Sequence, residues 1–205
     1  MNKTSTTHFP IHALLSERWS PRAFTDQAIK TEELGSLLEA ARWAPSCFNE
    51  QPWRFLVATR DDAAGFERLA SCLMDGNAWA RQAPVLILTV ARMTFERNNK
   101  PNRHAWHDVG LAAQNLVVQA QALGLSTHQM AGFDVQRARE VLGIPAGFEP
   151  VGMIAVGHRA APETLPEPLA EREVAARERK ELDAIVLGPS WDGGGFAGVR
   201  LVIRD

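Results

Sequence analysis

The stretch Pro45–Trp53, PSCFNEQPW, sets two primary amides among prolines and aromatic rings, directly after a strongly helical segment. Its two prolines restrict the backbone conformations open to the loop. Asn49 and Gln51 each carry hydrogen-bond donors and an acceptor, so they can bind the O=C–NH–C=O edge of a flat heterocycle. An ordinary helix-to-strand turn, with exposed amides and Trp53 in the core, explains the loop equally well. Other segments have to decide between these interpretations.

Upstream, the segment Arg18–Phe24, RWSPRAF, carries polar residues at alternate positions. Its proline favours extended backbone at Ser20, and alternate side chains of extended backbone share one side. Arg18, Ser20 and Arg22 would then form a phosphate clamp, because guanidinium groups match phosphate oxygens and the hydroxyl adds a donor. The alternative is a solvated arginine face with Trp19 packed inward.

A second arginine pair with the same alternate spacing, Arg177 and Arg179, lies near the C-terminus. Its signal is weaker because acidic residues surround it. The side chains that could neutralise the pair locally are Glu171, Glu173, Glu178 and Glu181.

Taken together, these segments resemble the FMN-dependent nitroreductase family, over about residues 11–186. An R-x-S-x-R-x-F segment binds the flavin phosphate in that family, and Arg18–Phe24 matches it. A P-S-S-x-N-x-Q-P-W loop lies against the flavin, and Pro45–Trp53 matches it, with Cys47 in place of the second serine. The first two motifs, in this order and at this distance, are fairly specific to the family.

Two later segments continue the resemblance. Gly124–Thr127, GLST, and the following Gln129–Phe133, QMAGF, are similar to the family's G-L-x-T segment and flavin-facing turn. The late K-x-R phosphate pair of the family corresponds to Arg177 and Arg179. Asn77 is a further ring or ribityl contact, assigned only from its position before the expected strand that begins at Pro84.

The resemblance implies that the flavin carries the chemistry, with no catalytic side chain and no metal. It implies contacts to the flavin phosphate from Arg18, Ser20, Arg22, Arg177 and Arg179. The other cofactor-binding residues that it implies are Trp19, Pro45, Ser46, Cys47, Asn49, Gln51, Asn77, Met130, Ala131 and Gly132.

The implied fold is α+β, a nitroreductase-like three-layer α-β-α arrangement with a central, mostly antiparallel sheet flanked by helices, in an intertwined homodimer. We expect one domain over residues 1–205, with 160–205 as a C-terminal arm and tail. The implied activity is an FMN flavoprotein oxidoreductase that moves a hydride from NADH or NADPH to a small acceptor such as a nitroaromatic or quinone. Dehalogenation or flavin breakdown are alternatives within the family.

Rivals from other classes are a non-catalytic flavin-binding protein and a metal-dependent hydrolase. The hydrolase would use His104, His107 and Asp108, which supply at most three ligands, so polar residues at a helix start explain them better. His128 is expected on a strand, where a lone histidine is more often a hydrogen-bonded neighbour than a catalyst.

Composition agrees with a soluble enzyme. The 205 residues are 45% hydrophobic, which suffices for one core, and the net charge of −2 gives no general attraction to nucleic acid. Residues 1–12 lack the apolar core of a signal peptide, and the apolar run 84–91 is too short to span a bilayer, so we expect no membrane partner and a cytoplasmic location. Cys47 and Cys72 form no metal or disulfide framework.

Hydrophobic periodicity predicts alternating helices and strands. The expected helices begin at Thr31, with Thr31 as the cap, and cover 61–73, 106–123 and 134–142, the last capped by Asp134. The expected strands are 55–59, 84–91 and 151–156. The helix 106–123 should bury a stripe of small residues and Leu123, and the resemblance implies that this helix lies in the dimer contact.

Beyond Arg159, three prolines precede a charged run that is too polar to form its own core. The resemblance implies that this arm wraps around a partner subunit, where Leu182–Leu187 would add a strand to the partner's sheet. The segment Val199–Ile203 is a candidate pairing strand at the end of the tail.

Overall fold

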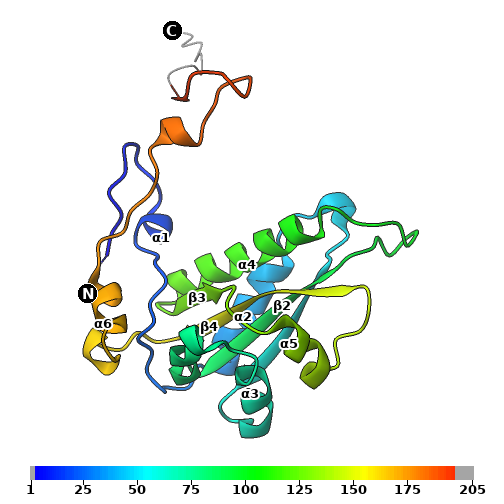
Figure 1. The fold of residues 1–205 in the computed structure, drawn as a ribbon, viewed down its shortest axis with the longest axis vertical. Coiled ribbons are helices and arrows are strands. Elements are labelled where there is room, and N and C mark those ends of the chain that lie inside the picture. The colour runs from blue at the N-terminus through cyan, green and yellow to red at the C-terminus, as the bar shows by residue number, and fades with distance from the viewer. Residues whose placement is uncertain (1–2, 197–205) are drawn as a thin grey trace. The chain divides into compact units, whose positions relative to one another are not determined.

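The computed structural model describes residues 3–196, so the predicted pairing strand at 199–203 lies outside the described residues. The chain divides into two compact units, Met1–Ala175 and Ala176–Asp205. The first unit contains the sheet and its flanking helices (Figure 1).

Four strands form one antiparallel sheet in the order β1-β2-β4-β3. Their bounds are β1 Trp53–Thr59, β2 Val85–Arg92, β3 Ser126–Met130 and β4 Phe148–Gly157. The three strands expected at 55–59, 84–91 and 151–156 are therefore confirmed. Strand β1 begins earlier than predicted and ends at the predicted residue, β2 is shifted by one residue, and β4 is longer at both ends.

Helices cover both faces of this sheet (Figure 1). The longer ones are α2 Thr31–Arg42, α3 Ala63–Ala70, α4 Ala105–Ala122 and α5 Val135–Leu142. Shorter elements are α1 Ala13–Ser16, α6 Leu169–Val174, and the 3₁₀ turns η1 Cys47–Asn49, η2 Asp75–Gln82, η3 Pro162–Thr164 and η4 Leu182–Ala184.

Strand β2 explains the layering. Its alternate residues Leu86 and Leu88 join a core cluster with residues of α3 and α5. Val85 and Ile87 point the other way and join a second cluster with residues of α2 and α4. Because successive side chains of a strand point to opposite faces, one apolar strand supplies both cores. The α+β three-layer architecture is confirmed.

The predicted helix ends are right in one case and shifted in two. Asp134 caps α5, since its carboxylate accepts a hydrogen bond from the Arg137 N–H at 2.9 Å. Helix α2 begins at Thr31, but its cap is Lys30, whose N–H donates to the Glu33 carboxylate at 3.0 Å. Helix α3 is shorter at both ends than the predicted 61–73, and the Asp62 side chain caps its start.

Helix α4 buries its small-residue stripe, as predicted. The stripe packs within a single chain, against α2 and the sheet. The Asn115 side chain donates to the Ala40 carbonyl at 3.1 Å, and that of Gln119 to the Ser36 hydroxyl at 2.9 Å. The stripe therefore has an intrachain partner and gives no evidence for a dimer. Leu123, expected to be buried, is 38% exposed at the C-cap.

The C-terminal region also differs from expectation. The predicted strand Leu182–Leu187 is wrong for this chain, since η4 occupies its first half and the Val186 N–H donates to the Leu182 carbonyl at 2.8 Å. Helix α6 was not predicted and belongs to the first unit. Among the described residues, none of the helices is long and apolar enough to cross a membrane.

Two leucines of the α4 region test this packing. Leu116 is fully buried, so Leu116→Ala should lower the free energy of unfolding by about 2–5 kcal/mol in chemical denaturation. The same change at the part-exposed Leu123 should cost about 1 kcal/mol or less. Equal losses from both variants would contradict the assignment of the α2–α4 contact as core.

Candidate functional site

The clamp segment, Arg18–Phe24, forms no helix, bends at Arg22 and ends in an isolated β-bridge at Phe24. The Arg18 guanidinium donates to the Ser20 hydroxyl at 3.2 Å, so these two side chains share one side. Trp19 lies elsewhere, with the Lys3 ammonium 4.5 Å from its ring centroid and the Arg159 guanidinium 6.0 Å away. The alternation inferred from the sequence is confirmed for these residues.

A buried glutamate holds the clamp backbone. The carboxylate of Glu173, 2% exposed, accepts hydrogen bonds from the Arg22 N–H at 2.9 and 3.0 Å and from the Ala23 N–H at 3.1 Å. The backbone carbonyl of Glu173 accepts a hydrogen bond from the Lys3 ammonium at 2.7 Å. The sequence had assigned Glu173 as a local neutraliser of Arg177 and Arg179, and the structure corrects this. Because Glu173 binds main chain, the Arg22 guanidinium stays available, with no ion-pair partner among the described residues.

His128 lies beside the same segment, on β3. One ring nitrogen, Nδ1, is 2.9 Å from the Pro21 carbonyl, and the ring centroid is 4.5 Å from that of Trp79. Burial lowers the pKa of His128 to about 4, and the positive charges of Arg22 and Arg18 add to this effect. The imidazole is therefore neutral at pH 7 and donates through Nδ1 to Pro21. Sequence reasoning identified His128 only as a hydrogen-bonded neighbour.

Asn77 and the turn at Met130–Gly132 come together in the structure. The Asn77 side-chain amide donates to the Gly132 carbonyl at 2.9 Å, and the Met74 N–H reaches the same oxygen at 3.2 Å. A Cβ at Gly132 would lie 2.5 Å from the Asn77 amide nitrogen, so a side chain there would displace the Asn77 amide. Asn77 therefore supports this turn.

The loop Pro45–Trp53 has strained backbone. Phe48, Asn49 and Gln51 have positive φ angles of 54°, 56° and 51°, in the left-handed region that non-glycine residues rarely adopt. The Gln51 side-chain amide donates to the side-chain oxygen of Asn49 at 3.2 Å, and the Gln51 N–H donates to the Ser46 hydroxyl at 3.0 Å. The two amides are thus held side by side.

Asp108 anchors this loop from α4. Its carboxylate, on a residue 2% exposed, accepts the Cys47 N–H at 3.0 Å and lies 3.3 Å from His107 Nδ1. The aspartate considered as a metal ligand thus serves the loop. Among the residues that the structure describes, no three His, Cys, Asp or Glu side chains are grouped so that they could hold a metal ion.

The loop and the clamp lie at opposite ends of the sheet (Figure 1). The loop leads into Trp53, which pairs with Ala91, whereas the clamp follows the other end, where Phe24 pairs with Arg159 beyond β4. Strand β1 has seven residues between these ends, a span of roughly 20 Å. One chain therefore does not place Asn49 and Gln51 beside the clamp.

Between the two ends, a cavity of about 280 Å³ lies next to α4. It is lined by Thr89, Val109, Gly110, Ala113, Gln129, Met130, Ala131, Val151 and Gly152. Two of the residues expected to contact the flavin ring, Met130 and Ala131, thus border an open space near the middle of the sheet.

The second arginine pair belongs to the other unit, Ala176–Asp205. There, burial and then repulsion from Arg179 lower the pKa of Arg177, and the Arg179 guanidinium donates to the Glu178 carbonyl at 2.6 Å. A phosphate-binding role of this pair stays a prediction.

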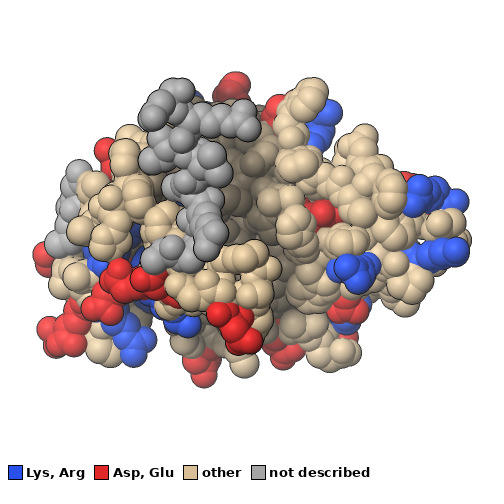
Figure 2. All heavy atoms as spheres, turned by 90° about the horizontal axis from the view of Figure 1, so that it is seen from above, with Lys and Arg blue, Asp and Glu red and all other residues tan. Residues whose placement is uncertain are grey.

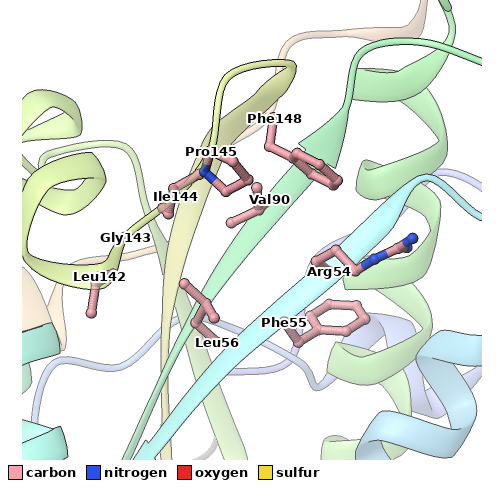
Figure 3. Close-up of a pocket in the computed structure, with 9 residues that line it drawn as sticks. All are labelled: Arg54, Phe55, Leu56, Val90, Leu142, Gly143, Ile144, Pro145 and Phe148. Atoms are coloured by element: carbon pink, nitrogen blue, oxygen red, sulfur yellow. The ribbon is translucent and has the colours of Figure 1, made fainter. Parts of the chain in front are cut away.

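A larger cavity, of about 380 Å³, contains none of the predicted site residues (Figure 3). Apolar side chains of β1, β2, β4 and the end of α5 form it, with Arg54 at one side. The Arg54 guanidinium is engaged by the carbonyls of Trp53 and Gln51, at 2.7 and 3.2 Å.

Comparisons with known proteins agree with this geometry. The model of the nitroreductase family matches residues 15–78 and 74–158. A solved structure of an oxidoreductase containing FMN superposes with a TM-score of 0.83 at 36% sequence identity, over 89% of this chain and 94% of that one.

Two curated relatives are similar to this chain in sequence. An uncharacterised 15.4 kDa protein of Mycolicibacterium smegmatis is 35% identical over 145 residues, 67% of this chain and 97% of its own length. An FMN reductase [NAD(P)H] of Bacillus subtilis is 26% identical over 163 residues, 71% of this chain and 64% of its own length. The match of the family model over most of the chain, on a sheet and loops of the expected form, shows that this chain belongs to the nitroreductase family.

Proposed function

We propose that this chain is an FMN-dependent oxidoreductase that takes a hydride from NADH or NADPH and passes electrons to a small oxidised acceptor, such as a nitroaromatic or a quinone. The observation that carries the proposal is the clamp, in which Arg18 and Ser20 share one side and the Arg22 side chain is left available by Glu173. The similarity to an FMN-containing oxidoreductase and to an FMN reductase supports the same function.

The donor set of the clamp fits a phosphate monoester. Two guanidinium groups can donate to several oxygens, and the Ser20 hydroxyl adds a donor. Neutral His128 contributes no charge, but it fixes the Pro21 carbonyl and with it the turn between Ser20 and Arg22. A flavin-phosphate role for Arg177 and Arg179 is also part of this proposal.

The loop and the turn would hold the ring end. Asn49 and Gln51 present amide groups side by side, and Met130 and Ala131 line the 280 Å³ cavity. Gly132, whose carbonyl accepts a hydrogen bond from Asn77, completes the turn. When bound, FMN supplies the redox chemistry, because its ring can accept a hydride and return electrons. The chain's task is to bind and orient the flavin, which explains why no charged general base stands out at the site.

We also propose that the active unit is a homodimer in which each flavin contacts both chains. The support is the position of the loop and the clamp at opposite ends of one sheet, so that a second chain can bring its loop to the first chain's clamp. Sedimentation velocity of the FMN-loaded protein tests this, since a monomer that turns over NAD(P)H would contradict it.

The first test of function is direct. The purified protein should be yellow, with a flavin absorption spectrum, and should consume NADH or NADPH steadily with a nitroaromatic or quinone acceptor. Flavin without turnover would favour a passive flavin-binding protein, and hydrolase activity without flavin would overturn the proposal.

Removing one clamp guanidinium should weaken cofactor retention. A charge-assisted hydrogen bond contributes about 1.5–3 kcal/mol, so Arg22→Ala should raise the FMN dissociation constant roughly ten- to hundredfold. Fluorescence of FMN released on dilution measures this. Arg22→Lys keeps the charge but loses the planar guanidinium, so its FMN dissociation constant should lie between those of Arg22→Ala and the unmodified protein. A full FMN complement in Arg22→Ala after dialysis would show that the clamp is misassigned.

His128 predicts a specific pH dependence of stability. The pKa of His128 is lowered from 6.5 to about 4. Between these pH values His128 is therefore mostly protonated in the unfolded chain and mostly neutral in the folded chain. The free energy of unfolding should therefore fall as the pH drops from about 6.5 to about 4, by at most about 3 kcal/mol from this group.

The matched variant is His128→Asn, which keeps a side-chain donor and removes the titration. Urea denaturation between pH 7 and pH 4 should show a flatter curve for this variant than for the unmodified chain. Parallel curves would mean that His128 titrates normally in the folded protein.

A further inference from the structure

The loop Pro45–Trp53 carries an exposed aromatic ring that no core packing explains. Phe48 is 72% exposed, although its backbone has a positive φ of 54°. The Arg97 guanidinium lies 4.2 Å from the Phe48 ring centroid and 5.4 Å from that of Phe95, and the two rings are 6.1 Å apart at 73°. We call Phe48, Phe95 and Arg97 the aromatic platform.

Polar contacts hold the two parts of the platform together. The Glu50 carboxylate accepts a hydrogen bond from the Glu96 N–H, which ties the loop to the segment 93–103. The Glu96 carboxylate in turn pairs with Arg92 at 3.0 Å. The platform is therefore built from two loops that a hydrogen bond links to each other and an ion pair links to the end of β2.

The chemistry of the platform suits a ligand with both a ring and a phosphate. A guanidinium stacked on aromatic rings uses its face and keeps its in-plane N–H groups for an anion. Lys100 and Arg103 add exposed positive charge to the same segment. Figure 2 shows Lys and Arg side chains gathered at the right-hand end of the molecule, the end at which this segment projects in Figure 1.

We propose that the aromatic platform binds the adenosine-phosphate half of the nicotinamide dinucleotide. This rests on the proposed function, because Phe48 directly precedes Asn49, an expected flavin contact. A dinucleotide with its nicotinamide at the flavin would extend past Asn49, and its second half carries both a base that stacks and phosphates that bind guanidinium. A small nitroaromatic or quinone acceptor lacks this combination of base and phosphates.

The test uses FMN-loaded protein and ADP-ribose, which lacks the nicotinamide and cannot donate a hydride. Isothermal titration calorimetry should show binding that weakens with added salt. Arg97→Ala should weaken ADP-ribose binding about tenfold or more, because it removes the charged contact. Phe48→Ala should weaken it roughly fivefold or more, because it removes the stacking ring. Arg68→Ala is the matched control, since it removes an exposed arginine of α3, a helix that lies away from the segment 93–103 (Figure 1), and it should leave ADP-ribose binding unchanged.

Steady-state kinetics complete the test. Arg97→Ala should raise the KM for NADH and NADPH and leave the KM for 4-nitrobenzoate unchanged. A rise for 4-nitrobenzoate alone, equal ADP-ribose affinity in Arg97→Ala and the unmodified protein, or no ADP-ribose binding at all would each overturn the proposal. These failures differ from failure of the proposed function, in which the protein would hold no flavin or show no NAD(P)H turnover.

Discussion

The structure depends on one strand that is buried on both faces. All but the last residue of β2 is buried, and its alternate side chains enter two separate cores. Because both sides of the strand must be covered, helices have to pack above and below the sheet, and the chain becomes three-layered. The two candidate segments, the loop and the clamp, lie at opposite ends of this layered sheet.

Two buried carboxylates hold the backbone of the candidate site. Glu173 binds the backbone of the clamp, and Asp108 binds the backbone of the loop. A buried carboxylate is costly unless hydrogen-bonded, so each one strongly favours the single backbone conformation that satisfies it. Both anchors accept hydrogen bonds from backbone N–H groups, so neither carboxylate is bound to a side chain of the clamp or of the loop. The strained φ angles at Phe48, Asn49 and Gln51 persist under this restraint.

The separation of the loop from the clamp bears on the assembly of the protein. The small-residue stripe of α4 is satisfied inside one chain, so it no longer bears on assembly. The proposal of a dimer rests on the positions of the two candidate segments, because the clamp and the loop lie at opposite ends of one sheet. The aromatic platform adds a charged extension to the loop end, suited to an elongated anionic ligand.

The sequence by itself determined the family, most helices and strands, and the side chains of the clamp and loop. These features rest on local spacing, such as alternate residues around Pro21 or the apolar periods of α4. The tertiary structure alone decided which groups hold the site: Glu173 and Arg22 are 151 positions apart, Asp108 and Cys47 are 61 apart, and His128 and Pro21 are 107 apart. No local pattern predicts such pairs, because they form only when the sheet and its layers bring distant segments together.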